Sequence, residues 1–248
     1  MANVALLGTG RMGTELGKHL LTAGHRLTVW NRTPSGADTL VNLGAVRAQS
    51  AKQAVANQDL AITCLFGPDT VQQVVVEPNL LPPGTLWLDI TTVGPRDADL
   101  FSDWAEAQGV RYVHGPVVGS LGPARARKLG VYLGGLPDDV AAVFPYVELW
   151  ADPERLVELE FQSQAADGKL VANLALGTAL EGLAEALRFG AIRGLDAPTT
   201  LKMLKGTALG FIADMKGPII LNHAYDDTQF SVDLLAKDAK LMLDALHE

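Results

Sequence analysis

A glycine-rich turn between two strand patterns at the start of the chain limits the possible folds more than any other feature. An apolar run over residues 4–7 leads directly into Gly8-Thr9-Gly10-Arg11-Met12-Gly13, which matches the pattern G-x-G-x-x-G. Apolar residues at helical spacing follow over 15–23, and a second strand pattern covers 27–30. This order predicts a parallel βαβ unit that binds a dinucleotide, whereas the glycines alone would also fit an ordinary turn.

The three glycines have separate purposes in such a unit. Gly8 permits a tight turn, Gly10 lets the backbone approach a pyrophosphate, and Gly13 lets the helix pack closely against the strand. The N-terminus of the helix then offers free N–H groups and a partial positive charge to the phosphates. We therefore expect residues 8–13 to bind the cofactor.

The end of the second strand indicates which dinucleotide is bound. Proteins that bind NAD usually place an Asp or Glu about 20 residues past the glycines, where it holds the ribose 2′-OH. This chain has Asn31-Arg32-Thr33 there. Arg32 offers a planar fork of donors to a 2′-phosphate, and Asn31 and Thr33 add neutral donors. The pattern predicts a preference for NADPH; the alternative is that Arg32 is a solvated loop residue.

The composition argues against several classes of function. A net charge of −8 over 248 residues argues against a nucleic-acid-binding surface, so local cations must attract an anionic substrate. Cys64 is the single cysteine, which indicates a reducing compartment, and the spacing of His114, His223 and His247 predicts no metal site. With a strand pattern from residue 4 and no apolar run of about 18 residues, we expect no signal peptide, no membrane span and a cytoplasmic location.

Strand and helix patterns alternate as far as about residue 150. Strands are predicted at 45–46, 60–65, 86–90, 111–114 and 131–135, and helices at 35–43, 51–57, 71–76, 96–108 and 140–149. Alternation requires crossover connections between strands. It therefore predicts an α/β fold with a doubly wound, mostly parallel sheet and helices on both faces.

The pattern changes near residue 160, where the strand signals stop. Residues 169–193 contain no proline and are apolar on nearly every face, which predicts a long helix that needs neighbours on all sides, a second subunit among them. Further helices are predicted at 198–204, at 211–221 with an interruption at Gly217-Pro218, and at 232–247. We therefore divide the chain into a nucleotide-binding domain over 1–160 and an all-helical substrate and dimerisation domain over 161–248.

Several stretches spread over nearly the whole chain occur in one known order. They are residues 8–13, Trp30-Asn31-Arg32-Thr33, Asp89-Ile90-Thr91-Thr92, Gly115-Pro116-Val117-Val118-Gly119-Ser120, Lys169 with Asn173, and Lys237-Asp238. The Lys-x-x-x-Asn pair followed by Lys-Asp is the most specific of them. Together they resemble the β-hydroxyacid dehydrogenase family, whose members include 3-hydroxyisobutyrate dehydrogenases, tartronate semialdehyde reductases and glyoxylate/succinic semialdehyde reductases.

The resemblance implies a Rossmann domain like that of 6-phosphogluconate dehydrogenase, then an all-helical domain, with the active site in the cleft. It implies a homodimer or homotetramer that uses NADP(H) to oxidise a small β-hydroxyacid or to reduce the matching aldehyde or keto acid. Lys169 would be the general acid/base, Asn173 would position the substrate, and Lys237 would lie beside the nicotinamide and the substrate. Leu65, Phe66 and Thr92 would contact the cofactor, and Val118, Gly119 and Ser120 would bind the substrate carboxylate.

The chemistry of Lys169 agrees with this role. Hydride delivered to a carbonyl carbon leaves an alkoxide, and an ammonium group can hydrogen-bond that oxygen and then give it a proton. Lys169 and Asn173 are four residues apart, so they share one face of a helix. Taken alone, Lys169 would be a solvated lysine at a helix end, and the resemblance favours the catalytic role.

The sequence also departs from the family pattern. Val118 stands where the family usually has serine, and Ser120 is the nearest hydroxyl. Arg127 and Lys128 stand where the family usually has Gly-Thr, either as extra cations for a larger anion or as part of a solvated loop. These departures concern the substrate and the level of activity more than the fold.

Two other functions stay open. Imine reductases share the Trp-Asn-Arg-Thr end of the second strand but generally lack the catalytic lysine, so Lys169 argues against them. A catalytically weak NADPH-binding protein, acting as a sensor or an interaction module, is suggested by Val118 and by the short segment after Lys237.

Overall fold

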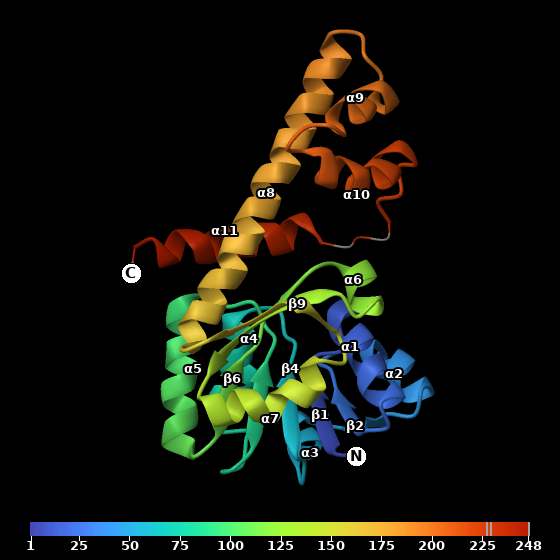
Figure 1. The fold of residues 1–248 in the computed structure, drawn as a ribbon. Helices are drawn as coiled ribbons and strands as arrows, with labels where there is room; N and C mark the ends of the chain where they lie inside the picture. Colours follow the sequence, from blue (N-terminus) through green and yellow to red (C-terminus); the bar gives the residue numbers. More distant parts are fainter. Residues whose placement is uncertain (227, 229, 248) are drawn as a thin grey trace. The chain divides into compact units, whose positions relative to one another are not determined.

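The computed structural model describes residues 1–226, 228 and 230–247, which form two units. Unit 1 contains residues 1–170 and the residues from Lys240 onward, and unit 2 contains residues 171–239. Unit 1 is a sheet with helices and unit 2 is helical, as the sequence predicted (Figure 1). The units divide within helix α8 (Gln162–Ile192), whereas the sequence pattern suggested a division near residue 160.

The strands of unit 1 follow the order β3-β2-β1-β4-β5-β6-β8-β7, and β9 pairs with β8. They are β1 (Asn3–Leu7), β2 (Arg26–Trp30), β3 (Val46–Arg47), β4 (Leu60–Thr63), β5 (Leu86–Asp89), β6 (Arg111–His114), β7 (Val117–Val118), β8 (Leu129–Gly135) and β9 (Ala151–Leu159). The pairs from β3 to β6 are parallel, β8 is antiparallel to β6 and β7, and β9 is parallel to β8. The predicted mostly parallel sheet is therefore confirmed.

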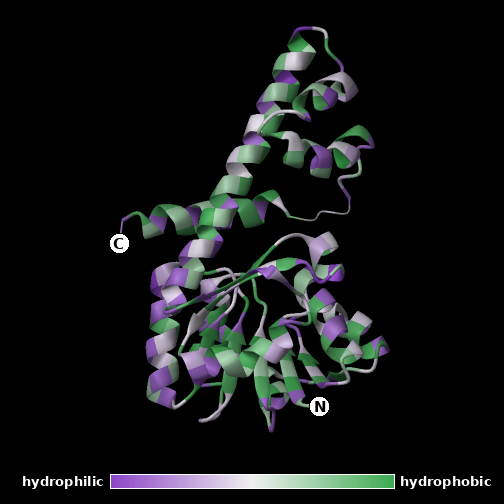
Figure 2. Ribbon diagram, viewed as in Figure 1, coloured by the Kyte–Doolittle hydropathy of each residue, from purple (hydrophilic) through white to green (hydrophobic). Residues whose placement is uncertain are grey.

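Helices cover both faces of this sheet, because alternate residues of each strand point to opposite sides. Val4 and Leu6 belong to one apolar cluster, and Ala5 and Leu7 belong to the other. The first cluster includes residues of α1 (Arg11–Thr22), α2 (Asp38–Asn42), α6 (Leu121–Arg125) and α7 (Pro137–Val147), and the second those of α3 (Ala51–Val55), α4 (Pro68–Val71), η2 (Gln72–Val76) and α5 (Pro95–Gln108). Figure 2 shows the hydrophobic colour concentrated on the central strands.

Strand β9 was missed by the sequence patterns. Most of its side chains are exposed or half-buried, and Glu154, Arg155 and Glu158 interrupt any apolar run. Backbone pairing with β8 forms this strand, from Leu129 with Ala151 to Gly134 with Leu159. A strand formed by pairing more than by burial leaves little trace in hydrophobic periodicity.

Unit 2 packs around a small apolar cluster. Leu183 of α8, Leu201 of α9 (Ala197–Leu204) and Ile212 of α10 (Gly210–Leu221) are buried in it. Helix α11 (Val232–Ala245) follows and continues into the residues that belong to unit 1. Pro218 lies inside α10, so the predicted interruption there is wrong. Proline lacks a backbone N–H, and the helix continues without that one hydrogen bond.

Helix α8 is longer and more exposed than predicted. It begins at Gln162 and not at Lys169. Its apolar side chains at Leu174, Phe189 and Ile192 are 57–73% exposed, so the described residues do not supply neighbours on all sides. Within the described part of the chain, α8 alone has the length and composition to cross a membrane, which by itself is weak evidence.

Candidate active site

The glycine turn lies at the carboxyl end of β1, and its geometry explains two of the three glycines. Gly8 has φ +97°, and a Cβ on it would lie 2.2 Å from the carbonyl oxygen of Cys64. A Cβ on Gly13 would lie 2.1 Å from the carbonyl oxygen of Gly8. Neither position has room for a side chain, because strand, turn and helix approach one another there.

Gly10 and Thr9 border the space above this turn. A Cβ on Gly10 would meet nothing within 4 Å, so the glycine is not required by packing inside the protein. The hydroxyl of Thr9 is buried without a hydrogen-bond partner in the described residues. Helix α1 begins directly after, at Arg11, and no side chain caps it. Open space, an unsatisfied hydroxyl and uncapped helix N–H groups together fit the phosphates of a dinucleotide.

The sheet order reverses at this turn, which is where open α/β sheets bind ligands. β1 lies between β2 and β4, so the carboxyl ends of all three strands meet at one edge. After β4 come Leu65, whose N–H donates to Thr91 Oγ1 at 3.0 Å, and Phe66, which is 56% exposed. Thr92 follows Thr91 at the same edge. The structure thus brings the predicted residues 8–13, 65–66 and 92 to one end of the sheet.

Asn31 joins the end of β2 to the glycine turn. The backbone N–H of Thr9 donates to Asn31 Oδ1 at 3.1 Å, and Asn31 Nδ2 donates to the carbonyl oxygen of Thr33 at 2.9 Å. Arg32 and Thr33 are exposed beside it. Asn31 therefore orders the segment that carries Arg32, a structural role that the sequence did not reveal.

A buried polar network lies beneath this edge. Asp89 Oδ1 accepts hydrogen bonds from Thr63 Oγ1 at 2.6 Å and from the N–H of Thr91 at 3.0 Å. Trp87 Nε1 donates to Thr63 Oγ1 at 2.8 Å. Burial raises the pKa of Asp89 to about 6, although the hydrogen bonds from Thr63 and Thr91 act in the opposite direction.

His114 lies beside this carboxyl group. Its Nδ1 is 3.9 Å from Asp89 Oδ2 and 3.3 Å from the hydroxyl of Tyr112, and neither Asp89 nor His114 is exposed. Burial lowers the pKa of His114 to about 3, so the ring is neutral at pH 7. Neither Asp89 nor His114 was a predicted site residue; a polar residue at the end of an apolar strand was the only signal in the sequence.

The loop after β6 contains the predicted substrate residues. Val118 pairs with Gly130 of β8, Gly119 has φ +139°, and Ser120 is the N-cap residue of α6. Lys169 Nζ donates to the carbonyl oxygen of Val117 at 2.8 Å. Within unit 1, the structure therefore holds the Lys169 ammonium group against this loop.

In unit 2 a buried carboxylate joins two other predicted residues. Asn173 Nδ2 donates to Asp238 Oδ2 at 2.6 Å, and Lys237 Nζ lies 2.8 Å from Asp238 Oδ1. Asp238 is 2% exposed and Asn173 is 5% exposed. Asp238 was part of the recognised Lys-Asp motif but was not proposed as a site residue.

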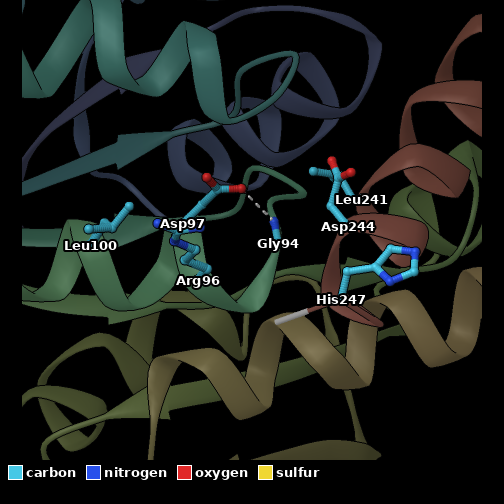
Figure 3. A pocket seen from close by; sticks show the side chains of 7 residues that line it. All are labelled: Gly94, Arg96, Asp97, Leu100, Leu241, Asp244 and His247. Carbon is cyan, nitrogen blue, oxygen red and sulfur yellow. Dashed lines mark hydrogen bonds between the residues drawn. The ribbon is translucent and has the colours of Figure 1, made fainter.

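Two further features lie apart from these residues. Arg127 donates to the carbonyl oxygens of Leu149 at 3.0 Å and Glu148 at 3.3 Å, so its guanidinium group holds the end of α7. A cavity of about 460 Å³ contains none of the predicted site residues, and Figure 3 shows the side chains around it. Among the described residues there is no group of three or more His, Cys, Asp or Glu side chains that could hold a metal ion.

Comparisons with known proteins match both parts of the chain. Residues 3–159 match the model described as the NAD binding domain of 6-phosphogluconate dehydrogenase. Residues 163–248 match the model described as the NAD-binding region of NADP-dependent 3-hydroxyisobutyrate dehydrogenase. A 3-hydroxyisobutyrate dehydrogenase of Pseudomonas aeruginosa is 30% identical over 214 residues, which are 85% of this chain and 71% of the relative.

Solved structures show the same fold. The 3-hydroxyisobutyrate dehydrogenase of Mycobacterium tuberculosis with L-serine has a TM-score of 0.85 and 26% identity, over 100% of this chain and 87% of that one. An imine reductase of Myxococcus stipitatus in complex with NADP+ has a TM-score of 0.76 and 21% identity, over 90% and 75% of the two chains. The second likeness concerns the fold alone.

Proposed function

Because this chain belongs to the β-hydroxyacid dehydrogenase family, we propose that it is an NADPH-dependent oxidoreductase of small β-hydroxyacids and of the matching aldehydes or keto acids. The hydrogen bond from Lys169 to the carbonyl oxygen of Val117 carries this proposal. It keeps an ammonium group at the loop 117–120, whose backbone N–H groups suit a substrate carboxylate.

Lys169 is proposed as the general acid/base. The bound cofactor supplies the hydride in the reductive direction. The Lys169 ammonium group hydrogen-bonds the carbonyl oxygen of the substrate and donates a proton as negative charge develops on that oxygen. In the oxidative direction the neutral amine takes the proton from the hydroxyl group.

Asn173 and Lys237 are proposed to position the substrate and the nicotinamide. Asp238 accepts from Asn173 and pairs with Lys237, so one carboxylate fixes both side chains. The Asn173 amide group carries two N–H donors, and Asp238 accepts from it. Lys237, with its side chain 15% exposed, adds a positive charge for an anionic substrate.

The preference for NADPH is proposed from Arg32. Arg32 is exposed at the end of β2, where a 2′-phosphate would meet its guanidinium group. Residues 31–33 include no carboxylate that could hold the 2′-OH of NAD. The side chain of the neighbouring Asn31 already makes hydrogen bonds within the protein, which leaves Arg32 and Thr33 as the proposed donors.

A homodimer or homotetramer is proposed from the exposed apolar side chains of α8. Leu174, Phe189 and Ile192 would cost free energy if they stayed in water, and a second subunit would cover them. We also propose that the protein works in the cytoplasm, on a small anionic molecule and without nucleic acid or a membrane.

A substrate panel tests the proposed function. Glyoxylate, succinic semialdehyde and tartronate semialdehyde are assayed with NADPH or NADH, and 3-hydroxyisobutyrate with NADP+ or NAD+. Turnover of at least one of these acids, faster with the 2′-phosphorylated cofactor and lost in Lys169→Met, is the expected result. Turnover of a cyclic imine but of none of the acids would indicate an imine reductase. Tight NADPH binding without any turnover would indicate a protein that is not an enzyme.

A further inference from the structure

Arg47 of β3 makes two contacts with the segment that follows Arg32. Its Nη1 donates to the carbonyl oxygen of Pro34 at 2.5 Å, and its Nη2 pairs with the carboxylate of Asp38. Pro34 is the first residue of η1 (Pro34–Ala37), and Asp38 is the first residue of α2. One guanidinium group therefore spans the turn between β2 and α2.

The sheet register places Arg47 where it can do this. Arg47 is paired with Val29 of β2, and the N–H of Ala48 donates to the carbonyl oxygen of Val29 at 2.9 Å. Residues 30–33 continue from Val29 toward the glycine turn. The backbone of Arg47 thus lies at the carboxyl edge of the sheet, next to the segment that carries Arg32.

The turn that Arg47 holds packs against Asn31. A Cβ on Gly36 would lie 2.5 Å from Asn31 Nδ2, so the η1 backbone is in close contact with that side chain. Asn31 in turn accepts from the N–H of Thr9. A continuous set of contacts therefore runs from Arg47 through η1 and Asn31 to the glycine turn.

The charge of Asp38 gives Arg47 a second effect. The Asp38 side chain is 56% exposed, and it lies at the other end of the same short turn as Arg32. An uncompensated carboxylate there would repel a 2′-phosphate. A charge-assisted pair with Arg47 offsets the negative charge of Asp38 and so reduces that repulsion.

We propose that Arg47 is a specificity-determining positioning residue for the 2′-phosphate of the cofactor, which it need not touch. It orders the turn after Arg32 through Pro34 and neutralises Asp38. This inference rests on the proposed NADPH preference. It adds a residue from another strand, outside the Asn31-Arg32-Thr33 segment.

Calorimetric titration of the full chain with two nucleotides tests this proposal. Adenosine 2′,5′-bisphosphate carries the 2′-phosphate and no nicotinamide, and ADP lacks the 2′-phosphate. Arg47→Met is expected to weaken the bisphosphate about fivefold or more, as the loss of an indirect charge contact should, and to leave ADP within about twofold. Arg26→Met is the matched control, because Arg26 is exposed at the opposite end of β2.

A double variant separates the two effects of Arg47. Asp38→Asn in the Arg47→Met background removes the uncompensated carboxylate, so it is expected to restore part of the lost affinity for the bisphosphate. Circular dichroism verifies that each variant is folded, and Arg47→Lys, which keeps the charge without the fork, is expected to bind between the wild type and Arg47→Met.

Two results would overturn the proposal. The proposal is overturned if Arg47→Met binds the bisphosphate within about fivefold of the wild type, or if it weakens binding of the bisphosphate and of ADP by the same factor. If the wild-type chain itself binds ADP as tightly as the bisphosphate, the NADPH preference fails and this inference fails with it. If Arg47→Met keeps the wild-type preference for the bisphosphate over ADP, the inference about Arg47 fails while the proposed NADPH preference stands.

Discussion

Asn173 donates a hydrogen bond of 2.6 Å to Asp238, a carboxylate that is almost completely buried. The same carboxylate pairs with Lys237. Two residues that are far apart in the sequence therefore depend on a third for their orientation.

Replacing Asp238 should impair catalysis through its neighbours. Asp238→Asn keeps the shape but removes the negative charge that pairs with the Lys237 ammonium group, at a cost of about 1–3 kcal/mol in the free energy of unfolding. Because Lys237 loses an ion pair and Asn173 keeps only a neutral acceptor, we expect kcat/KM to fall about 10- to 100-fold. Steady-state kinetics and urea unfolding measure both effects. Asp233→Asn, at an exposed position of α11, is the control and should leave both quantities nearly unchanged.

Removing the ammonium group of Lys169 should slow the chemical step by orders of magnitude. Lys169→Ala is expected to lower kcat by about 10²- to 10⁴-fold, which is the usual contribution of a positioned general acid. The dissociation constant for NADPH should change little. Lys52→Ala, on the exposed side of α3, is the control. A Lys169→Ala variant with more than a tenth of the wild-type activity would remove the proposed role.

Arg32→Ala should change the cofactor preference. The loss of a charge-assisted contact to the 2′-phosphate is expected to raise the KM for NADPH about 10-fold or more. The KM for NADH should stay within about threefold, because NADH has no phosphate there. Kinetics with both cofactors measure the ratio. An unchanged preference for NADPH would show that Arg32 is only a solvated loop residue.

Two glycine variants should separate folding from cofactor binding. Gly13→Ala places a Cβ 2.1 Å from the carbonyl oxygen of Gly8 and should lower the free energy of unfolding by about 2 kcal/mol or more. Gly10→Ala meets no protein atom within 4 Å and has an allowed φ of −63°, so its stability should stay near that of the wild type. Its affinity for NADPH should still fall, because the new Cβ enters the space proposed for the pyrophosphate. Chemical unfolding and fluorescence titration measure the two properties.

Asp89 and His114 should give opposite dependences of stability on pH. The pKa of Asp89 is raised to about 6 in the folded state, so between about pH 4 and 6 the folded chain binds more protons and stability falls as pH rises. The pKa of His114 is lowered to about 3, so between about pH 3 and 6.5 the unfolded chain binds more protons and stability rises with pH. In the wild type these two contributions offset each other between about pH 4 and 6.

Single variants remove one contribution and expose the other. Relative to the wild type, Asp89→Asn should become more stable with rising pH, and His114→Gln should become less stable, by up to about 1.4 kcal/mol per pH unit. Urea unfolding between pH 4.5 and 6.5 measures both slopes. Slopes of the same sign in the two variants would contradict the prediction.

The sequence predicted the parts of the fold that depend on local patterns. Glycine spacing and apolar runs were sufficient for β1, α1 and β2, because the pattern that identifies this unit lies within residues 4–30. Strand β9 was missed because its backbone is held by pairing with β8 while its charged side chains face solvent. The start of α8 at Gln162 was missed because residues 162–164 are polar and Gly168 is a poor helix former, so no apolar helical pattern begins before Lys169.

In the candidate site, too, short sequence patterns predicted some features, while others depend on contacts between distant residues. The sequence identified Asn31 as a cofactor residue, but its hydrogen bond to Thr9 connects residues 22 positions apart and cannot be read from spacing. Asp238 and His114 were overlooked for the same reason, since each depends on a partner from a distant element. Arg47 has no motif at all, and only the register of β3 beside β2 brings it to Pro34.

Unit 1 has one further consequence for how the protein is made. The chain leaves this unit at residue 170 and returns to it at Lys240, where buried Leu241 approaches Gly94 at the start of α5. A ribosome must therefore synthesise all of residues 171–239 before it makes the stretch that completes the nucleotide-binding unit. That unit cannot reach its final form early in translation, although most of it emerges first.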